Sequence, residues 1–94
     1  MSKRKKLLQK LKDNPKGRTR QDIVTLLGSF GFVLERASGS HHSFVLREGI
    51  SAHRITVPIH GQQVKSVYVK QIVEQIEALF PEQERDDRAE EDEA

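Results

Sequence analysis

The stretch Gly39-Ser40-His41-His42-Ser43-Phe44 contains a turn, and it places two adjacent histidines directly after that turn. Residues 42–47 then alternate between an apolar side that carries Phe44 and a more polar side. This alternation predicts the second strand of a β-hairpin. Since successive side chains of a strand point to opposite faces, we expect His41 to face solvent and His42 to face the side of Phe44.

Two further strands are predicted, one on each side of this stretch. Residues 32–37 form an extended run before the turn, and residues 53–59 alternate apolar and polar side chains after a second turn at 48–51. Pro58 has no backbone N–H to donate, so it marks the end of the third strand or an exposed edge. The sequence therefore predicts a three-stranded antiparallel sheet.

Helices are predicted before and after this sheet. Thr19 is placed to cap the first helix, with Asp22 three residues later as a shortened capping box, and Gly31 ends that helix. The last helix follows the polar loop at 60–63 and closes at Pro81. Apolar residues recur at helical spacing at Ile23, Leu26, Leu27 and Phe30 in the first helix, and at Val69, Ile72, Val73, Ile76 and Phe80 in the last.

Composition divides the chain into three parts. Residues 1–18 are a basic arm, in which leucines among lysines over 3–13 favour a short amphipathic helix and a frayed tail is the alternative. Residues 19–80 are the domain. Residues 81–94 hold eight acids without a large apolar anchor, so we expect a disordered acidic tail. The predicted fold is α+β, the α-β-β-β-α layout of a double-stranded-RNA-binding-like domain with both helices on one sheet face.

Composition also limits the classes of function. The net charge of the 94 residues is +2, but residues 1–20 hold nine Lys or Arg against one acid. Such a block is typical of a phosphate-binding surface or of a solvated tail. The chain has no cysteine, which excludes disulfides and thiolate chemistry. No apolar run reaches the roughly 20 residues that cross a bilayer, so we expect a cytoplasmic protein.

Four blocks of the sequence, in this order and at these intervals, resemble the HicA-type toxins of bacterial toxin–antitoxin pairs. They are residues 23–32, 39–44, 55–60 and 69–73. The resemblance implies a small endoribonuclease (mRNA interferase) that cleaves messenger RNA and that a HicB-type antitoxin neutralises. It also implies that a histidine of the Gly-Ser-His-His segment is catalytic, and His41 is the matching residue, with His42 in reserve.

Three features depart from the family pattern. They are the basic extension before Thr19, the acidic tail after Pro81 and the bulky pair Val67-Tyr68 at the start of the last helix. These departures bear on the contacts with an antitoxin and on toxicity.

Cleavage of RNA without a metal requires a base for the 2′-hydroxyl, an acid for the leaving oxygen and positive charge for the phosphate. His41 is the candidate acid or base, because imidazole titrates near neutrality. Lys65, at the head of the last helix, and Arg47, on the same strand face as His41, are the candidate phosphate-binding charges. Lys70 and Ser40 are further candidate RNA contacts, and Gly39 is the turn residue.

Alternatives to this hypothesis stay open. The domain could be a non-catalytic RNA-binding or protein-interaction module, in which the histidines stabilise the hairpin. The acidic tail could fold back on the basic arm and lower activity. A metal site that joins His41 to His53 and His60 is disfavoured, because these spacings match no recognised ligand pattern. We therefore expect RNA and an antitoxin as partners, and neither a metal nor another cofactor.

Overall fold

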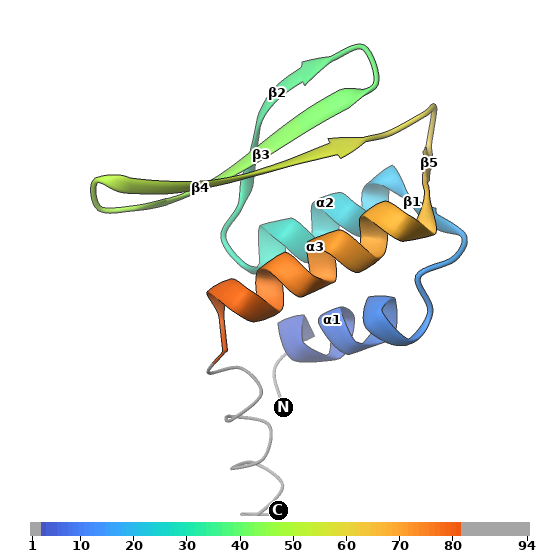
Figure 1. Ribbon diagram of the computed structural model, residues 1–94, viewed down its shortest axis with the longest axis horizontal. Helices are drawn as coiled ribbons and strands as arrows, with labels where there is room; N and C mark the ends of the chain where they lie inside the picture. The colour runs from blue at the N-terminus through green and yellow to red at the C-terminus, as the bar shows by residue number, and fades with distance from the viewer. Residues whose placement is uncertain (1–2, 82–94) are drawn as a thin grey trace, which may run out of the picture.

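A computed structural model describes residues 3–81 of the chain. Its helices and strands follow one another as drawn in Figure 1. The helices are α1 Lys3–Asp13, α2 Arg20–Ser29 and α3 Ser66–Leu79. The strands are β1 Arg18–Thr19, β2 Val33–Ser38, β3 His41–Glu48, β4 Ser51–Pro58 and β5 Gln63–Val64.

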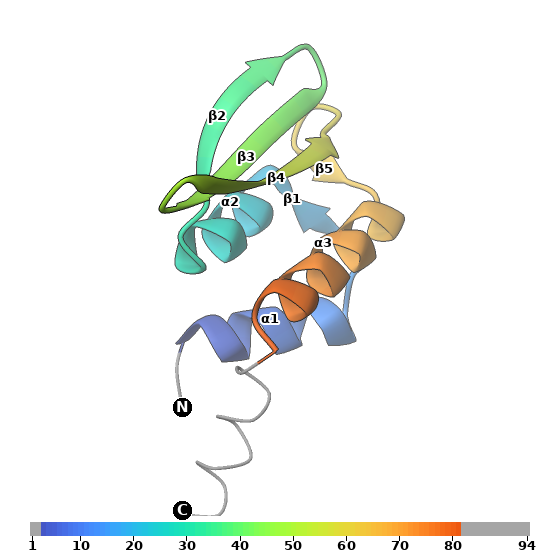
Figure 2. The ribbon, with the colours of Figure 1, turned by 60° about the vertical axis from the view of Figure 1, so that its left-hand side comes forward.

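The main sheet has the strand order β2-β3-β4, and both strand pairs are antiparallel. Helices α2 and α3 cover one face of this sheet, whereas no described segment covers the other face (Figures 1 and 2). The predicted α+β fold with the α-β-β-β-α order is thereby confirmed. Pro58 ends β4, which is an edge strand, as its missing N–H predicted.

Helix α2 begins at the predicted capping box. The hydroxyl of Thr19 accepts a hydrogen bond from the Asp22 N–H at 3.3 Å, and the Asp22 carboxylate accepts one from the Thr19 N–H at 2.9 Å. At the other end, Gly31 has a φ of +93°, a conformation that side chains disfavour, and the Phe32 N–H donates to the Leu27 carbonyl at 2.9 Å. The chain therefore leaves α2 directly into β2.

The core lies between the sheet and the helices. Each predicted apolar position of α2 is buried, and in α3 the first four are buried while Phe80 packs at the edge of the core. Phe44 and the inner residues of β4 cover them from the sheet side. Burial of this apolar surface supplies the main favourable free energy of folding.

Helix α1 forms a third layer beneath α2 and α3 (Figures 1 and 2). The amphipathic helix predicted over 3–13 is present, and Leu8 and Leu11 are buried in the same apolar cluster as the rest of the core. The Arg4 guanidinium lies 5.3 Å from the centre of the Phe30 ring, which itself packs 5.1 Å from the Phe80 ring. The basic extension is therefore packed on the domain through its leucines.

A second, two-stranded sheet was not predicted. Strand β1 pairs with β5, with Arg18 opposite Val64 and Thr19 opposite Gln63. Two residues in each strand give too short a pattern for periodicity to reveal, and the pairing joins segments that are far apart in the sequence. The β1–β5 sheet therefore holds the start of α2 next to the start of α3.

Residues 82–94 of the expected acidic tail over 81–94 lie outside the described residues. Among residues 3–81, no helix has both the length and the apolar character needed to span a bilayer.

Candidate functional site

His41 is the first residue of β3, and its side chain is exposed. His42 is half-buried, and its ring Nδ1 lies 3.4 Å from the Ser40 carbonyl oxygen. In the register of the sheet, His42 faces Ala37 and Val57, and buried Phe44 follows on the same side two residues later. The two histidines therefore point to opposite faces, as strand alternation predicts, and His41 lies on the open face.

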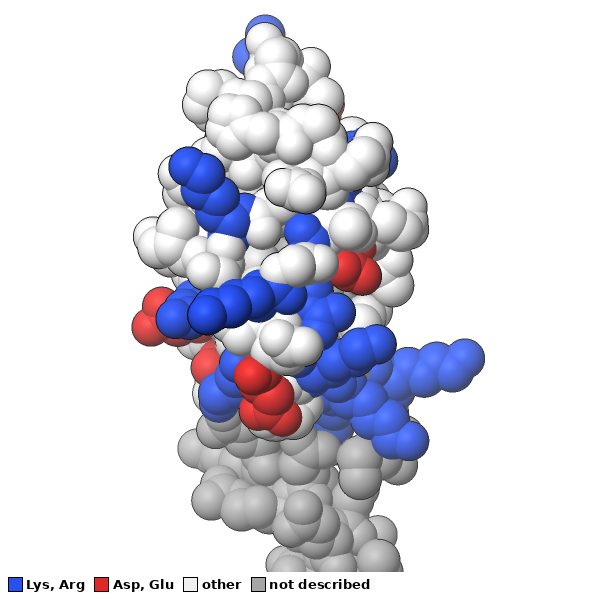
Figure 3. Space-filling model, turned by 90° about the vertical axis from the view of Figure 1, so that its right-hand side faces the viewer, with Lys and Arg blue, Asp and Glu red and all other residues white. Residues whose placement is uncertain are grey.

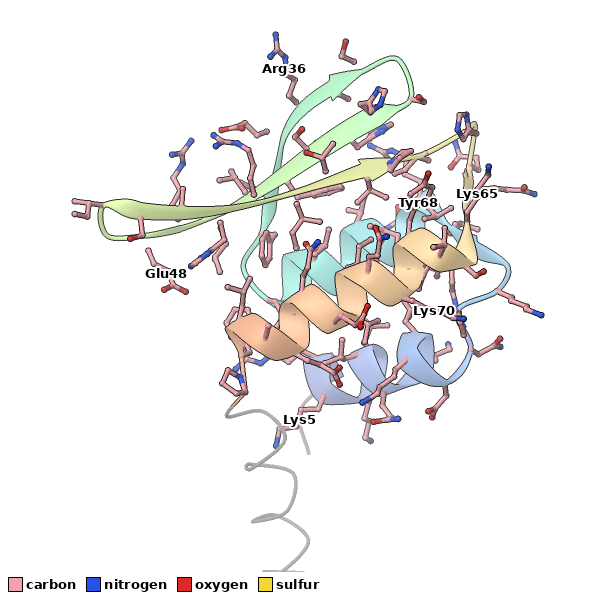
Figure 4. The ribbon with its side chains drawn as sticks, in the orientation of Figure 1. Lys5, Arg36, Glu48, Lys65, Tyr68 and Lys70 are labelled. Atoms are coloured by element: carbon pink, nitrogen blue, oxygen red, sulfur yellow. The ribbon has the colours of Figure 1, made fainter. Side chains whose placement is uncertain are left out.

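A β-bulge in β2 decides which residues surround His41. The pairing of β2 with β3 shifts between Leu34 and Arg36, so Glu35 is the extra residue. Because of this shift, Arg36 lies opposite Ser43, and Ser38 lies opposite His41. A regular ladder would instead have turned Arg36 toward the helices. Figure 4 shows Arg36 pointing away from them, on the open side of the sheet.

The immediate neighbours of His41 on the open face are small or polar. Ser38 lies opposite it on β2, and Pro58 lies opposite it on β4. Two residues along, the Ser43 and Thr56 hydroxyl oxygens are 3.3 Å apart. Arg36 is the diagonal neighbour, and such diagonal residues are about 7–8 Å apart. The site is thus an exposed area of the sheet surface, and the cation within side-chain reach of the His41 imidazole is Arg36.

Arg47 shares the face of His41 but lies at the far end of β3. Six residues separate them, which corresponds to about 20 Å along a strand. The Arg47 guanidinium donates to Glu35 at 3.1 Å, and Arg54 donates to both oxygens of Glu35 at 2.8 and 3.0 Å. The structure therefore does not bring Arg47 next to His41.

This ion cluster has an electrostatic signature. The hydrogen bond from Arg54 is the main cause that holds the pKa of Glu35 below its ordinary value, and the positive charges of Arg54, Arg47 and Arg36 add to it. The hydrogen bond between Arg54 and Glu35 also raises the pKa of Arg54. We interpret the cluster as a charged cover of the sheet, because it lies over the buried Val45 on the open face.

Lys65 lies at the end of the molecule that also carries the histidine turn. It is the N-cap residue of α3, and its side chain makes no capping hydrogen bond. A groove beside it is lined by Lys16 and Arg18 from the segment before α2 and by Ser66 from α3. Figure 3 views this end, where Lys and Arg side chains form a band across the middle, below a mostly uncharged region that carries further Lys or Arg atoms at its top. The band provides positive charge next to the site.

Lys70 lies on the opposite side of α3 from Lys65. Figure 4 shows Lys65 at the head of the helix and Lys70 on the side that faces α1. The backbone of Lys65 is still extended, with a ψ of 144°, whereas Lys70 lies within the helix, so helical spacing does not relate the directions of the two side chains. Ser40 and Gly39 form the turn itself, where Gly39 has a φ of +59° and the Ser40 carbonyl accepts a hydrogen bond from the Ile59 N–H at 2.6 Å.

The geometry gives no sign of a metal centre in the described part of the chain, where no three His, Cys, Asp or Glu side chains gather. His53 lies opposite Leu46, near the β3–β4 turn and therefore at the far end of the sheet from His41. Its half-buried side chain lines a groove with Gln75 and Leu79 of α3.

Sequence reasoning missed three residues beside this site. The position of Arg36 on the open face could not be predicted, because alternation of side chains does not reveal a β-bulge. Lys16 and Arg18 were interpreted only as part of the basic arm. For these two, the signal available was the glycine at position 17, which has a φ of +71° and turns the chain into the β1–β5 ribbon.

The fold and the site define a small double-stranded-RNA-binding-like domain with an exposed histidine at one end of its sheet and a band of cations beside it. Residues 20–78, more than half of the chain, match the family described as HicA toxin of bacterial toxin-antitoxin. The chain therefore belongs to the HicA toxin family, as its sequence motifs indicated. No curated protein and no solved structure matches it significantly.

Proposed function

We propose that this protein is a toxin-type endoribonuclease that cleaves messenger RNA in the cytoplasm by metal-independent acid–base catalysis at His41. The observation that carries the proposal is the position of His41, an exposed imidazole that opens β3 on the uncovered face of the sheet. An imidazole in such a position is accessible to a phosphodiester, and imidazole is the side chain that most often serves as a general acid or base. Membership of the HicA family supports the same activity.

The residues around His41 suggest how RNA binds. Arg36 reaches the same face from β2, and Lys65 and the exposed Lys16 of its groove continue the positive charge around the end of the molecule, whereas Arg18 is paired with Asp22. In this proposal these cations bind the phosphate backbone, since ion pairing to phosphates supplies most sequence-independent affinity for nucleic acids. Arg47 and Lys70 have no part in this step, because one is paired with Glu35 and the other faces α1.

A HicB-type antitoxin is the proposed protein partner. Family membership implies a toxin–antitoxin pair, and an inhibitor that covers the open sheet face would block access to His41. Basic side chains beside the face favour an acidic contact surface on this partner.

The experiment incubates the purified full-length protein with an unstructured RNA in the presence of a chelator. The nuclease yields fragments. A non-catalytic RNA-binding module yields only a shifted band, and a protein-interaction module yields neither. Fragments that vanish when the chelator is added would refute the metal-independent mechanism while leaving the nuclease activity in place.

A further inference from the structure

His60 lies beside the histidine turn although 19 residues separate it from His41 in the sequence. The Ile59 N–H donates to the Ser40 carbonyl at 2.6 Å, so the pairing of β3 with β4 continues past Pro58. Pro58 is the register partner of His41. Two residues further along, His60 is therefore a diagonal neighbour of His41, which corresponds to about 7–8 Å between the two residues.

Side-chain direction also brings the two histidines together. Pro58 shares the open face with His41, whereas Ile59 is buried and points into the core. Alternation then returns His60 to the side of Pro58, and His60 is exposed. Among residues 3–81, neither the His41 ring nor the His60 ring has a hydrogen-bonding partner. Both imidazoles are therefore available to a ligand that binds on the open face of the sheet.

The backbone around His60 is held on both sides. The His60 N–H donates to the Gln63 carbonyl at 3.1 Å, and the Gln63 N–H donates back at 3.0 Å, which closes a two-residue turn with Gly61 at a φ of +64°. The Gln62 carbonyl accepts a hydrogen bond from the Arg20 N–H at 2.8 Å. Position 60 is thus held by backbone hydrogen bonds of its own and of its neighbours, which is the support that a catalytic group needs.

We propose that His60 is the second proton-transfer residue of the site and acts with His41 as an acid–base pair on RNA. This inference rests on the proposed ribonuclease function. One imidazole accepts the 2′-hydroxyl proton while that oxygen attacks phosphorus. The bond from phosphorus to the 5′-oxygen breaks, and the other imidazole donates its proton to that oxygen. The products are a 2′,3′-cyclic phosphate and a 5′-hydroxyl end, and proton exchange with water restores both rings.

The charged groups around the pair are cations. Arg36 faces it from β2, Arg20 begins α2 beside the 60–63 turn, and Lys65 is the N-cap residue of α3. Tyr68 of α3 points toward the underside of the same end of the sheet (Figure 4). The nearest acids of the sheet, Glu35 and Glu48, lie in the bulge of β2 and at the far end of β3. A phosphodiester between the two imidazoles would therefore lie near positively charged side chains, which favour its binding.

The test compares His60→Gln with His53→Gln in the full-length protein. His53 is a matched control, because it lies on β4, the strand that leads to His60, but at the far end from His41. We expect His60→Gln to lower single-turnover cleavage by about 10²–10⁴-fold and to remove one limb of a bell-shaped pH–rate profile. His53→Gln should retain both limbs. Binding to an uncleavable 2′-deoxy analogue should change less than about threefold in either variant.

A substrate with sulfur at the 5′-bridging position separates the two roles, because its leaving group needs no proton from an acid. We expect this substrate to restore the rate of one of the variants His41→Gln and His60→Gln, and not of the other. If His60→Gln cleaves like His53→Gln, or if the sulfur substrate rescues both variants or neither, the pairing is refuted while the ribonuclease function stands. A wild-type protein that leaves RNA intact would overturn both.

Discussion

Leu11→Ala tests whether α1 is part of the cooperative domain. Leu11 is 1% exposed and packs in the common apolar cluster beneath α2 and α3. Truncation of a buried leucine to alanine costs about 2–5 kcal/mol, through lost transfer free energy and the cavity that remains. Small domains have a total stability of about 5–15 kcal/mol, so this loss is a large fraction of it.

The assay is equilibrium urea unfolding followed by circular dichroism. With a slope of roughly 1–2 kcal/mol per molar urea, the midpoint should fall by about 1–5 M while the slope is unchanged. Leu7→Ala is the control, since Leu7 is only partly buried at the edge of the cluster and should cost less. A loss below about 1 kcal/mol for Leu11→Ala would show that α1 is not part of the folding unit.

Three further predictions concern the charged residues. The pKa of Glu35 is held below its ordinary value, so its contribution to stability is complete above a pH of about 4.3 and is lost as the pH falls through the lower folded value. Glu35→Gln should therefore weaken the acid dependence of the urea midpoint, and an unchanged dependence would contradict this account. Arg36→Ala should slow RNA cleavage by about tenfold or more, whereas Arg47→Ala should stay within about threefold of wild type; equal effects would refute the role of the bulge. Lys65→Ala should make the salt dependence of RNA binding shallower by about one unit of slope, and Lys70→Ala should leave it unchanged, as titrations at several salt concentrations will show.

The sequence was sufficient to predict the elements that repeat a local signal. The capping residue Thr19 and the apolar spacing of both main helices were visible without a structure, and the alternation after Gly39 separated His41 from His42. Each of these features depends on neighbours within a few residues, so a pattern in the sequence records it.

The remaining features depend on pairing between distant segments. The bulge at Glu35 moves Arg36 to the open face, and only the register with β3 reveals this. Likewise, the hydrogen bond from the Ile59 N–H to the Ser40 carbonyl brings His60 to the turn, although the 53–59 strand was predicted. For Arg47, alternation predicted the correct face of the sheet. It did not exclude Arg47 from the site, although Arg47 lies at the other end of β3 from His41.

The catalytic role of His41 is tested by the single-turnover rate of RNA cleavage, in chelator, for His41→Gln compared with His42→Gln. Both variants should first be shown to fold by circular dichroism. We predict that His41→Gln loses about 10²-fold or more of the wild-type rate, because the proposed mechanism assigns proton transfer to this exposed imidazole. His42→Gln should remain within about tenfold of wild type. Wild-type cleavage by a folded His41→Gln protein would contradict the assignment of His41 as the catalytic residue.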